Sequence, residues 1–447
     1  MRSRVLLSVL ALLAVCAPLD AAHAFCGFYV ASGEAKLFNH RSQVALVRDG
    51  DRTVLTMASD YEGDPREFAL VVPVPVVLKR GQIHVGDSSL VAKLDAYSAP
   101  RLVQYDDPDP CPMANQTWGA MKGLYASALS VDKVALTTRV EESRVRIEAR
   151  YEVDEYDVLI LSADDSGALI DWLTAHGYRV PMQASRVVQS YLKQGMKFFV
   201  AKVDLRRRAA QGIKQLRPLQ IAYESPRFML PVRLGMANSN GPQELFVYAV
   251  TRTGRVEPVN YRSLKLPEEV DAPAFVKGDF SNVWRAAFDR LVEQNGMGVV
   301  YTEYAWDMTW CDPCPSPPLD RDEQKALGVW WLDEPNATVF VTRLHARYDR
   351  ESFPEDLVLQ TTADRANFQS RVVVHNEWTG EARCEGANAY RQSLPARREK
   401  DARSLASLTG WPLEQIRARM GVSTAWLAPG ESLTPYRTAA WWEKLWK

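Results

Sequence analysis

The sequence predicts an α+β fold with a β-rich N-terminal part, mixed antiparallel sheets with packed helices, and a short helical C-terminal extension. Alternating apolar and polar runs joined by turns fill the first part of the chain. After residue 144, helical segments with one apolar face alternate with such runs, and beyond Cys384 the chain becomes Arg-rich and strand-poor. The 447 residues, 47% hydrophobic and 24% charged, suffice for a sizeable core and indicate two or three domains.

The N-terminal part contains a hairpin and a buried strand. Residues 43–47 and 53–57 alternate on either side of Asp49-Gly50, and Asp-Gly between such runs favours the tight turn of a hairpin. Residues 68–72 are predicted to form a buried strand. Pro73 and Pro75 should end its ladder or confine it to a sheet edge, because proline has no backbone N–H.

The first helix is expected after this strand. Ser88 or Ser89 can cap it, and Pro100 stops it. Its apolar face consists of Leu90, Val91, Leu94 and Tyr97. The prolines at positions 108, 110 and 112 then predict a rigid acidic loop around Cys111.

The middle part is predicted to mix helices and strands. One helix is capped by Asp165 or Ser166 and ends at Gly177, and a second covers residues 187–192. A hairpin turn is expected at Thr253-Gly254. Strands are expected at residues 144–152, 158–161, 197–203, 219–223, 229–234 and 244–251.

The last part continues this mixture and then becomes helical. One helix should begin at Ser281 and end at Asn295-Gly296. Asp320 and Glu323 have the spacing of a capping box for a short helix that ends near Gly328. Further strands are expected at residues 339–347 and 371–374, and helix breaks at Pro395 and Pro412.

Residues 1–24 have the pattern of a signal peptide. Two arginines precede an apolar run over residues 5–17, and Ala22-His23-Ala24 is a small-x-small pattern, so cleavage is expected between Ala24 and Phe25. Cys26 lacks the small preceding residue of a lipoprotein signal. The remaining chain divides into residues 25–385, with a candidate sub-boundary near 135–150, and a helical, Arg- and Trp-rich extension over residues 386–447.

The mature chain is therefore expected to be exported, either periplasmic or secreted. No later segment reaches the roughly 18 apolar residues of a membrane helix. Loss of the signal removes two arginines and one aspartate, which lowers the formal net charge by one, from -1 to -2, and no basic stripe predicts nucleic-acid binding. Trp441, Trp442 and Trp446 form an apolar stripe that docks on the protein or contacts a membrane interface.

Trp310-Cys311-Asp312-Pro313-Cys314 concentrates the chemistry of the chain. One hypothesis is dithiol redox chemistry, but the prolines at 315, 317 and 318 disfavour the helix that stabilises a reactive thiolate. A second is a zinc site completed by Cys111 or Cys384, although no histidine stands at ligand spacing. The third, favoured here, is a structural disulfide. The candidate cysteines are Cys26, Cys111, Cys311, Cys314 and Cys384, which allow two internal bridges with open connectivity and leave one thiol.

Other catalytic signals are weak. No cofactor-binding or metal motif is present, so no cofactor is expected. Glu303 and Asp307 are the remaining candidate for a carboxylate pair. The histidines of the mature chain lack a nucleophile motif and are interpreted as structural or surface residues: His40, His84, His176, His345 and His375.

Several stretches, in their order along the chain, resemble the bacterial exported proteins of the domain of unknown function family 2330. They are FALVVPVP at 68–75, WLTAHGY at 172–178 with Pro181, LPVRL at 230–234, CDPCP at 311–315 with Leu319, VTRL at 341–344 and DLVL at 356–359. The resemblance implies no established activity. The prediction is a non-catalytic exported envelope, binding or structural protein of unknown ligand. The alternative is an extracytoplasmic thiol-disulfide oxidoreductase that uses Cys311 and Cys314.

Overall fold

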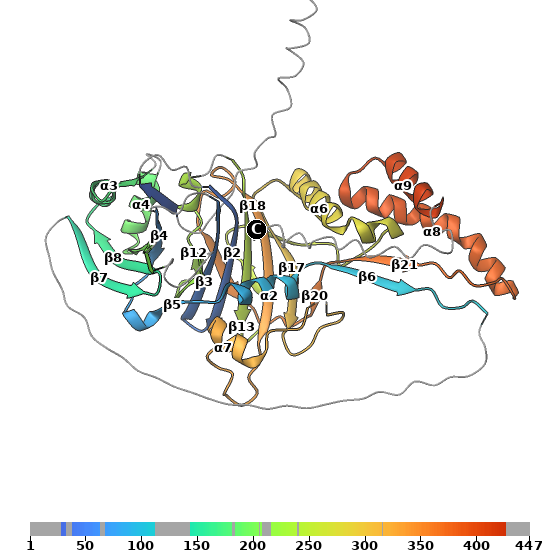
Figure 1. Cartoon of the computed structure of the whole chain (residues 1–447), viewed down its shortest axis with the longest axis horizontal. Coiled ribbons are helices and arrows are strands. Elements are labelled where there is room, and N and C mark those ends of the chain that lie inside the picture. The colour runs from blue at the N-terminus through green and yellow to red at the C-terminus, as the bar shows by residue number, and fades with distance from the viewer. Residues whose placement is uncertain are drawn as a thin grey trace, which may run out of the picture.

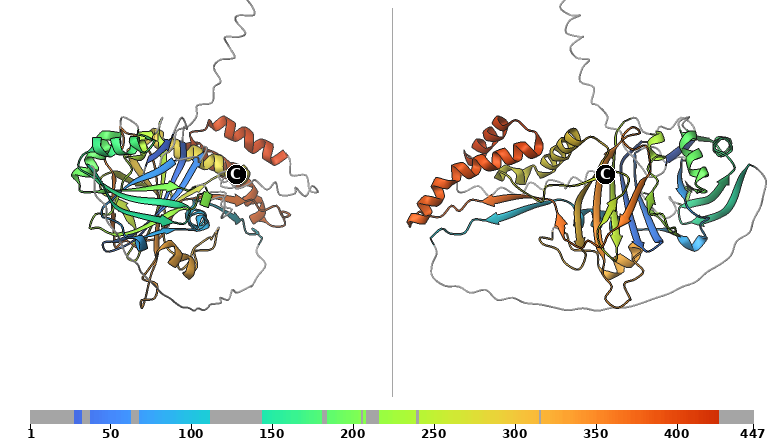
Figure 2. Two further views of the ribbon diagram at one scale, coloured as in Figure 1. Left: turned by 60° about the vertical axis from the view of Figure 1, so that its left-hand side comes forward. Right: turned by 180° about the vertical axis from the view of Figure 1, so that it is seen from behind.

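The computed structural model describes residues 28–32, 38–62, 68–111, 144–180, 184–204, 206–207, 216–238, 241–314 and 316–425. As predicted, the fold is α+β (Figure 1). Two large β-sheets face each other, helices cover the outer face of each, and a smaller sheet with the C-terminal helices extends to one side (Figures 1 and 2). Within these ranges no helix has the length and apolar character needed to cross a membrane.

One large sheet has nine strands, in the order β15-β17-β18-β13-β2-β3-β11-β5 with β20 paired to β17. The predicted hairpin is confirmed by β2 and β3, and Gly50 in its turn has φ 56°, a left-handed value that favours glycine. Two of the pairings, β13 with β2 and β15 with β17, are parallel. The strands are β2 (Phe38–Asp49), β3 (Arg52–Glu62), β5 (Ile83–Val85), β11 (Leu219–Glu224), β13 (Gln243–Thr251), β15 (Arg262–Lys265), β17 (Val299–Asp307), β18 (Phe340–Tyr348) and β20 (Phe368–Gln369).

The other large sheet has six strands in the order β7-β8-β10-β4-β1-β9. The expectation that Pro73 ends the β4 ladder or lies on an edge strand was wrong, because β4 lies inside the sheet and Pro73 pairs with Phe198. The proline is tolerated since β1 pairs with β4 only up to Val71, which leaves Pro73 one partner strand among the described residues. The strands are β1 (Phe28–Ser32), β4 (Phe68–Val74), β7 (Val145–Val153), β8 (Tyr156–Ala163), β9 (Tyr178–Arg179) and β10 (Lys197–Val203).

The main core lies between the two large sheets. On β2, Val44 and Leu46 point into this core, whereas Ala45 and Val47 face the opposite side, as the two-residue period of a strand requires. The outer face of the nine-stranded sheet packs against α2 (Ser88–Ser98) and α7 (Arg321–Leu327). The outer face of the six-stranded sheet packs against α3 (Ser166–Ala175) and α4 (Ala184–Lys193). The molecule is therefore a two-sheet sandwich with a helical layer on each side.

Carboxylates cap three of these helices. Asp87, and neither predicted serine, caps α2, because its carboxylate accepts a hydrogen bond from the backbone N–H of Ser89. Asp165, one of the two residues expected to cap α3, does so. Asp320 and Glu323 form the predicted capping box of α7.

A parallel three-stranded sheet and four helical segments form a lateral unit (Figure 2). Its elements are β6 (Arg101–Asp106), β16 (Glu269–Asp271), β21 (Arg371–Asn376), η3 (Ala274–Gly278), α6 (Phe280–Asn295), α8 (Glu385–Thr409) and α9 (Leu413–Ala425). The break predicted at Pro395 was wrong, because α8 continues through this residue. Ala402, Leu405 and Leu408 are buried in the core of this unit, and their packing offsets the hydrogen bond that the proline removes.

A small sheet packs against the main core in the order β12 (Met229–Leu230), β19 (Leu357–Thr361) and β14 (Val256–Pro258). The hairpin turn predicted at Thr253-Gly254 was wrong, since β14 pairs with β19 and not with β13. Gly254 instead allows a close backbone contact, because a Cβ there would lie 2.4 Å from the carbonyl oxygen of Asp364. The strand predicted at 229–234 is only two residues long. Two short helical turns, η1 (Arg80–Gln82) and η2 (Gly235–Asn238), complete the described elements.

Candidate functional site

The Cys-x-x-Cys motif lies on the loop that follows β17. Cys311 and Cys314 form a disulfide with their Cα atoms 5.2 Å apart, and the Asp312–Pro313 peptide bond between them is cis. Cys311 is half-buried and Cys314 is exposed. The next helix, α7, begins only at Arg321. The first sulfur therefore lacks the helix N-terminus that lowers a thiol pKa in dithiol redox enzymes.

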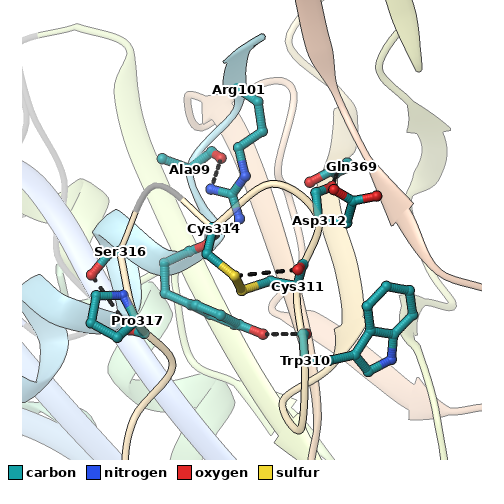
Figure 3. Close-up of a disulfide and its surroundings, with 10 residues drawn as sticks. Ala99, Arg101, Trp310, Cys311, Asp312, Cys314, Ser316, Pro317 and Gln369 are labelled. Carbon is teal, nitrogen blue, oxygen red and sulfur yellow. Dashed lines mark hydrogen bonds between the residues drawn. A yellow bond between two sulfur atoms is a disulfide. The ribbon is translucent and has the colours of Figure 1, made fainter. Parts of the chain in front are cut away.

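Three neighbouring elements hold this loop in place, and Figure 3 shows the two contacts made with the carbonyl groups of Trp310 and Asp312. The Tyr97 hydroxyl of α2 donates a hydrogen bond to the carbonyl oxygen of Trp310 at 3.3 Å. The Gln369 side chain of β20 donates to the carbonyl oxygen of Asp312. The Trp310 ring packs edge-on against Trp306 of β17, with centroids 4.9 Å apart, yet Trp310 remains 50% exposed. The loop is thus fixed on the protein and presents an indole to solvent.

Arg101 reaches from β6 toward the disulfide loop (Figure 3). Its buried guanidinium donates to the carbonyl oxygens of Tyr97 at 2.6 Å and Ala99 at 2.8 Å, at the end of α2. The same group lies 5.3 Å from the ring centroid of Tyr304. Burial lowers the pKa of Arg101 to about 10, against the opposing influence of Tyr304 and Tyr97. Because a cation at a helix C-terminus satisfies its free carbonyls, Arg101 acts as a cap for α2.

The second disulfide joins Cys111, after β6, to Cys384, which precedes α8. Its Cα atoms are 5.9 Å apart, and its two cysteines are 273 positions apart in the sequence. The cysteines at 111, 311, 314 and 384 thus form two separate pairs. The described part of the chain contains no group of three or more His, Cys, Asp or Glu side chains that could hold a metal ion. The zinc hypothesis therefore has no candidate site in these ranges.

A buried charge network lies on the outer face of the nine-stranded sheet. Its first member, Glu303, is at a β-bulge, since the register of β17 against β18 shifts between Thr302 and Tyr304. The Nε atom of Arg343 donates to Glu303 Oε2 at 2.6 Å, and its Nη1 atom donates to Asp95 Oδ1 of α2 at 2.5 Å. Glu303 is 0% exposed and Arg343 only 2%.

His345 continues this network beneath α6. Its Nδ1 atom lies 2.8 Å from Glu303 Oε1, and its ring stacks between Phe246 and Phe288, with centroid distances of 4.0 and 3.6 Å. The interpretation of His345 as a structural residue fits this buried position. No catalytic motif in the sequence predicted the network, because its members come from three elements.

The network keeps the carboxylate of Glu303 and the guanidinium of Arg343 ionised. Burial raises the pKa of Glu303, but His345 and Arg343 together outweigh burial and lower it to about 2. Burial lowers the pKa of Arg343, and Asp95 and Glu303 reverse this to a net increase. Asp307 has a different partner, Arg365, so the structure does not join it with Glu303 into one site. The buried network is suited to holding α2 on the sheet and not to contact with a substrate.

We expect the stability of the protein to fall through Glu303 as the pH drops from 4.5 to 2. The pKa of this carboxyl is about 2 in the folded chain and 4.5 ordinarily, so the unfolded chain takes up the proton first. The stabilisation is present above pH 4.5, is lost as the pH falls toward 2, and amounts to about 3 kcal/mol. Urea unfolding at about pH 5.5 and about pH 3 should detect about 2 kcal/mol of this loss, with Glu303→Gln for comparison. Equal pH dependence in the two proteins would contradict this assignment.

A cleft lined by several distant segments was not predicted from the sequence. Its larger hollow has a volume of about 670 Å³ and its smaller one about 280 Å³. The β2–β3 turn and β19 line the first, and the end of β4 with β11 lines the second. The residues shared by both walls are Gln194, Pro226, Arg227 and Met229. The sequence signals at the cleft were Pro73 and Pro75, which were expected to end a strand and gave no indication of a cleft.

Three of the stretches that carry the family resemblance meet at this cleft. Residues 68–75 contribute Pro73 and Pro75, residues 230–234 contribute Pro231, and residues 356–359 contribute Val358 and Leu359. A carboxylate holds the last two stretches together. Asp356 accepts hydrogen bonds from the Tyr191 hydroxyl at 2.6 Å and from the Arg233 backbone N–H at 3.2 Å. The cleft walls are therefore fixed by the core of the protein.

The other predicted residues lie away from these sites. His84 and His176 are exposed. His375 is half-buried, and its Nδ1 and Nε2 atoms lie 3.7 Å from Asp107 and Asp271, respectively. The adjacent arginines at 397 and 398 are both ion-paired, with Arg397 bound to Asp107 and Arg398 to Glu377. The candidate residues outside the described ranges are Ala24, Phe25, Cys26, Trp441, Trp442 and Trp446.

Comparison with known proteins identifies a family but no activity. No curated protein and no solved structure matches the chain. The sequence model of the family described as "Uncharacterized protein conserved in bacteria (DUF2330)" matches residues 20–360. This match includes the Cys311–Cys314 loop and most of the two large sheets, and it confirms the resemblance found in the sequence. The chain therefore belongs to the bacterial domain of unknown function family 2330.

Proposed function

We propose that this chain is an exported, non-catalytic binding or structural protein of the bacterial envelope. The observation that carries the proposal is the geometry of the Cys311–Cys314 loop, which is closed by a disulfide, held by three neighbouring elements and separated from the next helix, which begins only at Arg321. A dithiol redox centre requires an activated thiolate, and a helix N-terminus is a common source of that activation. The motif instead resembles a structural bridge.

Two further features support export. The bridge between Cys111 and Cys384 closes a long loop, and such disulfides persist mainly in oxidising compartments. The first 24 residues have the signal-peptide pattern, with cleavage proposed after Ala24. The periplasm or the extracellular space is therefore the proposed location.

The cleft supports binding over a purely structural role. Its larger hollow, about 670 Å³, lies in the usual range for sites that take small molecules. Polar side chains line it together with apolar ones, and this combination orients a ligand in most such sites.

The thiol state of the mature protein tests the non-catalytic proposal. We expect alkylation under denaturing conditions without reductant to modify only Cys26, and alkylation after reduction to modify all five cysteines of the mature chain. Mass spectrometry measures both states. We also expect no acceleration of insulin reduction by dithiothreitol, with equal rates for the wild type and the Cys311→Ser/Cys314→Ser variant.

Thiol-disulfide exchange through Cys311 and Cys314 is the second candidate function. Arg101, whose side chain extends toward the disulfide loop in Figure 3, favours it, because a cation near a reduced cysteine stabilises the thiolate. Insulin reduction that is faster with the wild type than with Cys311→Ser/Cys314→Ser would support this candidate and reject the non-catalytic proposal. Arg101→Met should then also slow the reaction, whereas a cap of α2 alone would affect stability and not turnover.

A further inference from the structure

The cleft places two guanidinium groups beside an apolar surface. Arg48, at the end of β2, lines the larger hollow, is 6% exposed, and has its guanidinium carbon 5.0 Å from the ring centroid of Phe228. Arg227, in the β11–β12 connection, is exposed, lines both hollows and donates to Gln194 Oε1 at 2.8 Å. Each guanidinium carries five N–H donors, and Arg48 uses one on the Thr53 hydroxyl at 2.8 Å, so both retain donors for a ligand.

Acidic side chains near the cleft do not cancel these charges. Asp49 lines the hollow but is ion-paired with Arg252 at 3.2 Å. Asp51 lies 3.5 Å from Arg48 Nη2, and its side chain is 68% exposed, so water screens this contact. The larger hollow therefore offers positive charge to a ligand.

The adjoining hollow is mostly apolar. Its walls include Leu55, Pro73, Pro75, Met196, Ile221, Tyr223 and Pro231. The polar part of its lining is supplied by Gln194, Ser225 and Arg227. Met229 and Pro226 belong to both hollows and form a continuous apolar path from the arginines into the smaller one.

We propose that this cleft binds a small amphiphile with one carboxylate head group and an apolar chain or ring. The carboxylate accepts hydrogen bonds from Arg227 and Arg48, and the apolar part lies along Phe228 and Met229 toward the smaller hollow. Guanidinium groups pair well with carboxylates because both are planar. The inference rests on the proposed binding function and names the ligand class for it.

Three probes of equal chain length test this proposal on the mature protein. We expect octanoate to bind saturably, octanol to bind at least about tenfold more weakly, and octylammonium not to bind, as measured by calorimetry below micelle-forming concentrations. Arg227→Gln should weaken octanoate binding about tenfold or more, because it removes a charged donor. Met229→Trp should abolish binding by filling the path between the hollows. The matched control Arg383→Gln, at an exposed arginine paired with Glu381, should bind octanoate like the wild type.

Several outcomes would overturn the proposal. These are the absence of saturable octanoate binding, equal affinity for octanol and octanoate, and equal binding by Arg227→Gln and the wild type. Circular dichroism of each variant confirms that a loss of binding is not a loss of fold. The thiol and insulin assays are independent of the cleft, so a failure of the ligand proposal leaves the non-catalytic proposal standing, and the reverse also holds.

Discussion

Glu303→Gln is expected to lower the free energy of unfolding by about 3–5 kcal/mol, the range for removing one partner of a buried ion pair. Glutamine keeps the size of the side chain but leaves Arg343, 2% exposed, with Asp95 as its remaining carboxylate partner in the network. His345 also loses the charged acceptor at its Nδ1 atom. The physical cause of the loss is that the buried Arg343 cation keeps only one of its two compensating carboxylates. Urea unfolding near pH 7, followed by circular dichroism, measures it.

An exposed ion pair provides the matched control. Glu381 and Arg383 have side chains that are 79% and 76% exposed, so Glu381→Gln should change stability by less than about 0.5 kcal/mol. Replacing both charges, in Glu303→Gln/Arg343→Met, should cost less than the sum of the single changes, because neither partner is then left alone. A loss below about 1 kcal/mol for Glu303→Gln would contradict the proposed role of the network.

The sequence predicted those elements whose signals are local. The hairpin at Asp49-Gly50 and the capping box of Asp320 and Glu323 depend on residues a few positions apart, and both are confirmed. The strand expected at 197–203 matches β10 at both ends. Such patterns can be recognised without knowing which segments pair.

Long-range pairing was not predictable in the same way. Strand β6 pairs in parallel with β21, about 270 positions later, and no local turn signals that contact. Strand β16 has only three residues and therefore little periodicity. The large local penalty of Pro395 predicts a helix break, whereas packing of α8 on this sheet decides the outcome.

The candidate sites also differ in whether a local sequence signal reveals them or the folded structure is needed. The Cys-x-x-Cys loop could be located from its motif, but pairing Cys111 with Cys384 required the folded structure. Glu303 could not be assigned to the outer face by alternation, because the bulge turns both Glu303 and Tyr304 to that side. The cleft combines segments from β2 to β19, and no single stretch contains its chemistry.

Replacing Cys111 and Cys384 together with serine is expected to lower the free energy of unfolding by about 2–5 kcal/mol. Their bridge closes a loop of 273 positions, and the chain-entropy relation gives about 6 kcal/mol for such a loop as an upper estimate. The bridge also ties the start of α8 to the segment after β6. Hydrogen exchange of the α8 amides should therefore accelerate in the variant. Urea unfolding under non-reducing conditions measures the global effect.

The Cys311→Ser/Cys314→Ser variant is the control. It also removes one disulfide, but that disulfide closes a much shorter loop. Its cysteines are three positions apart, and the same relation gives only about 2 kcal/mol for that loop. The lateral unit keeps other ties when the long bridge is removed, since Arg397 remains 2.6 Å from Asp107 and Lys400 remains 2.7 Å from Asp271. These contacts should keep α8 folded and make the loss partial. If removal of the short bridge destabilised the protein more than removal of the long one, the Cys311–Cys314 loop would be the main covalent constraint, and the assignment of that role to Cys111–Cys384 would be wrong.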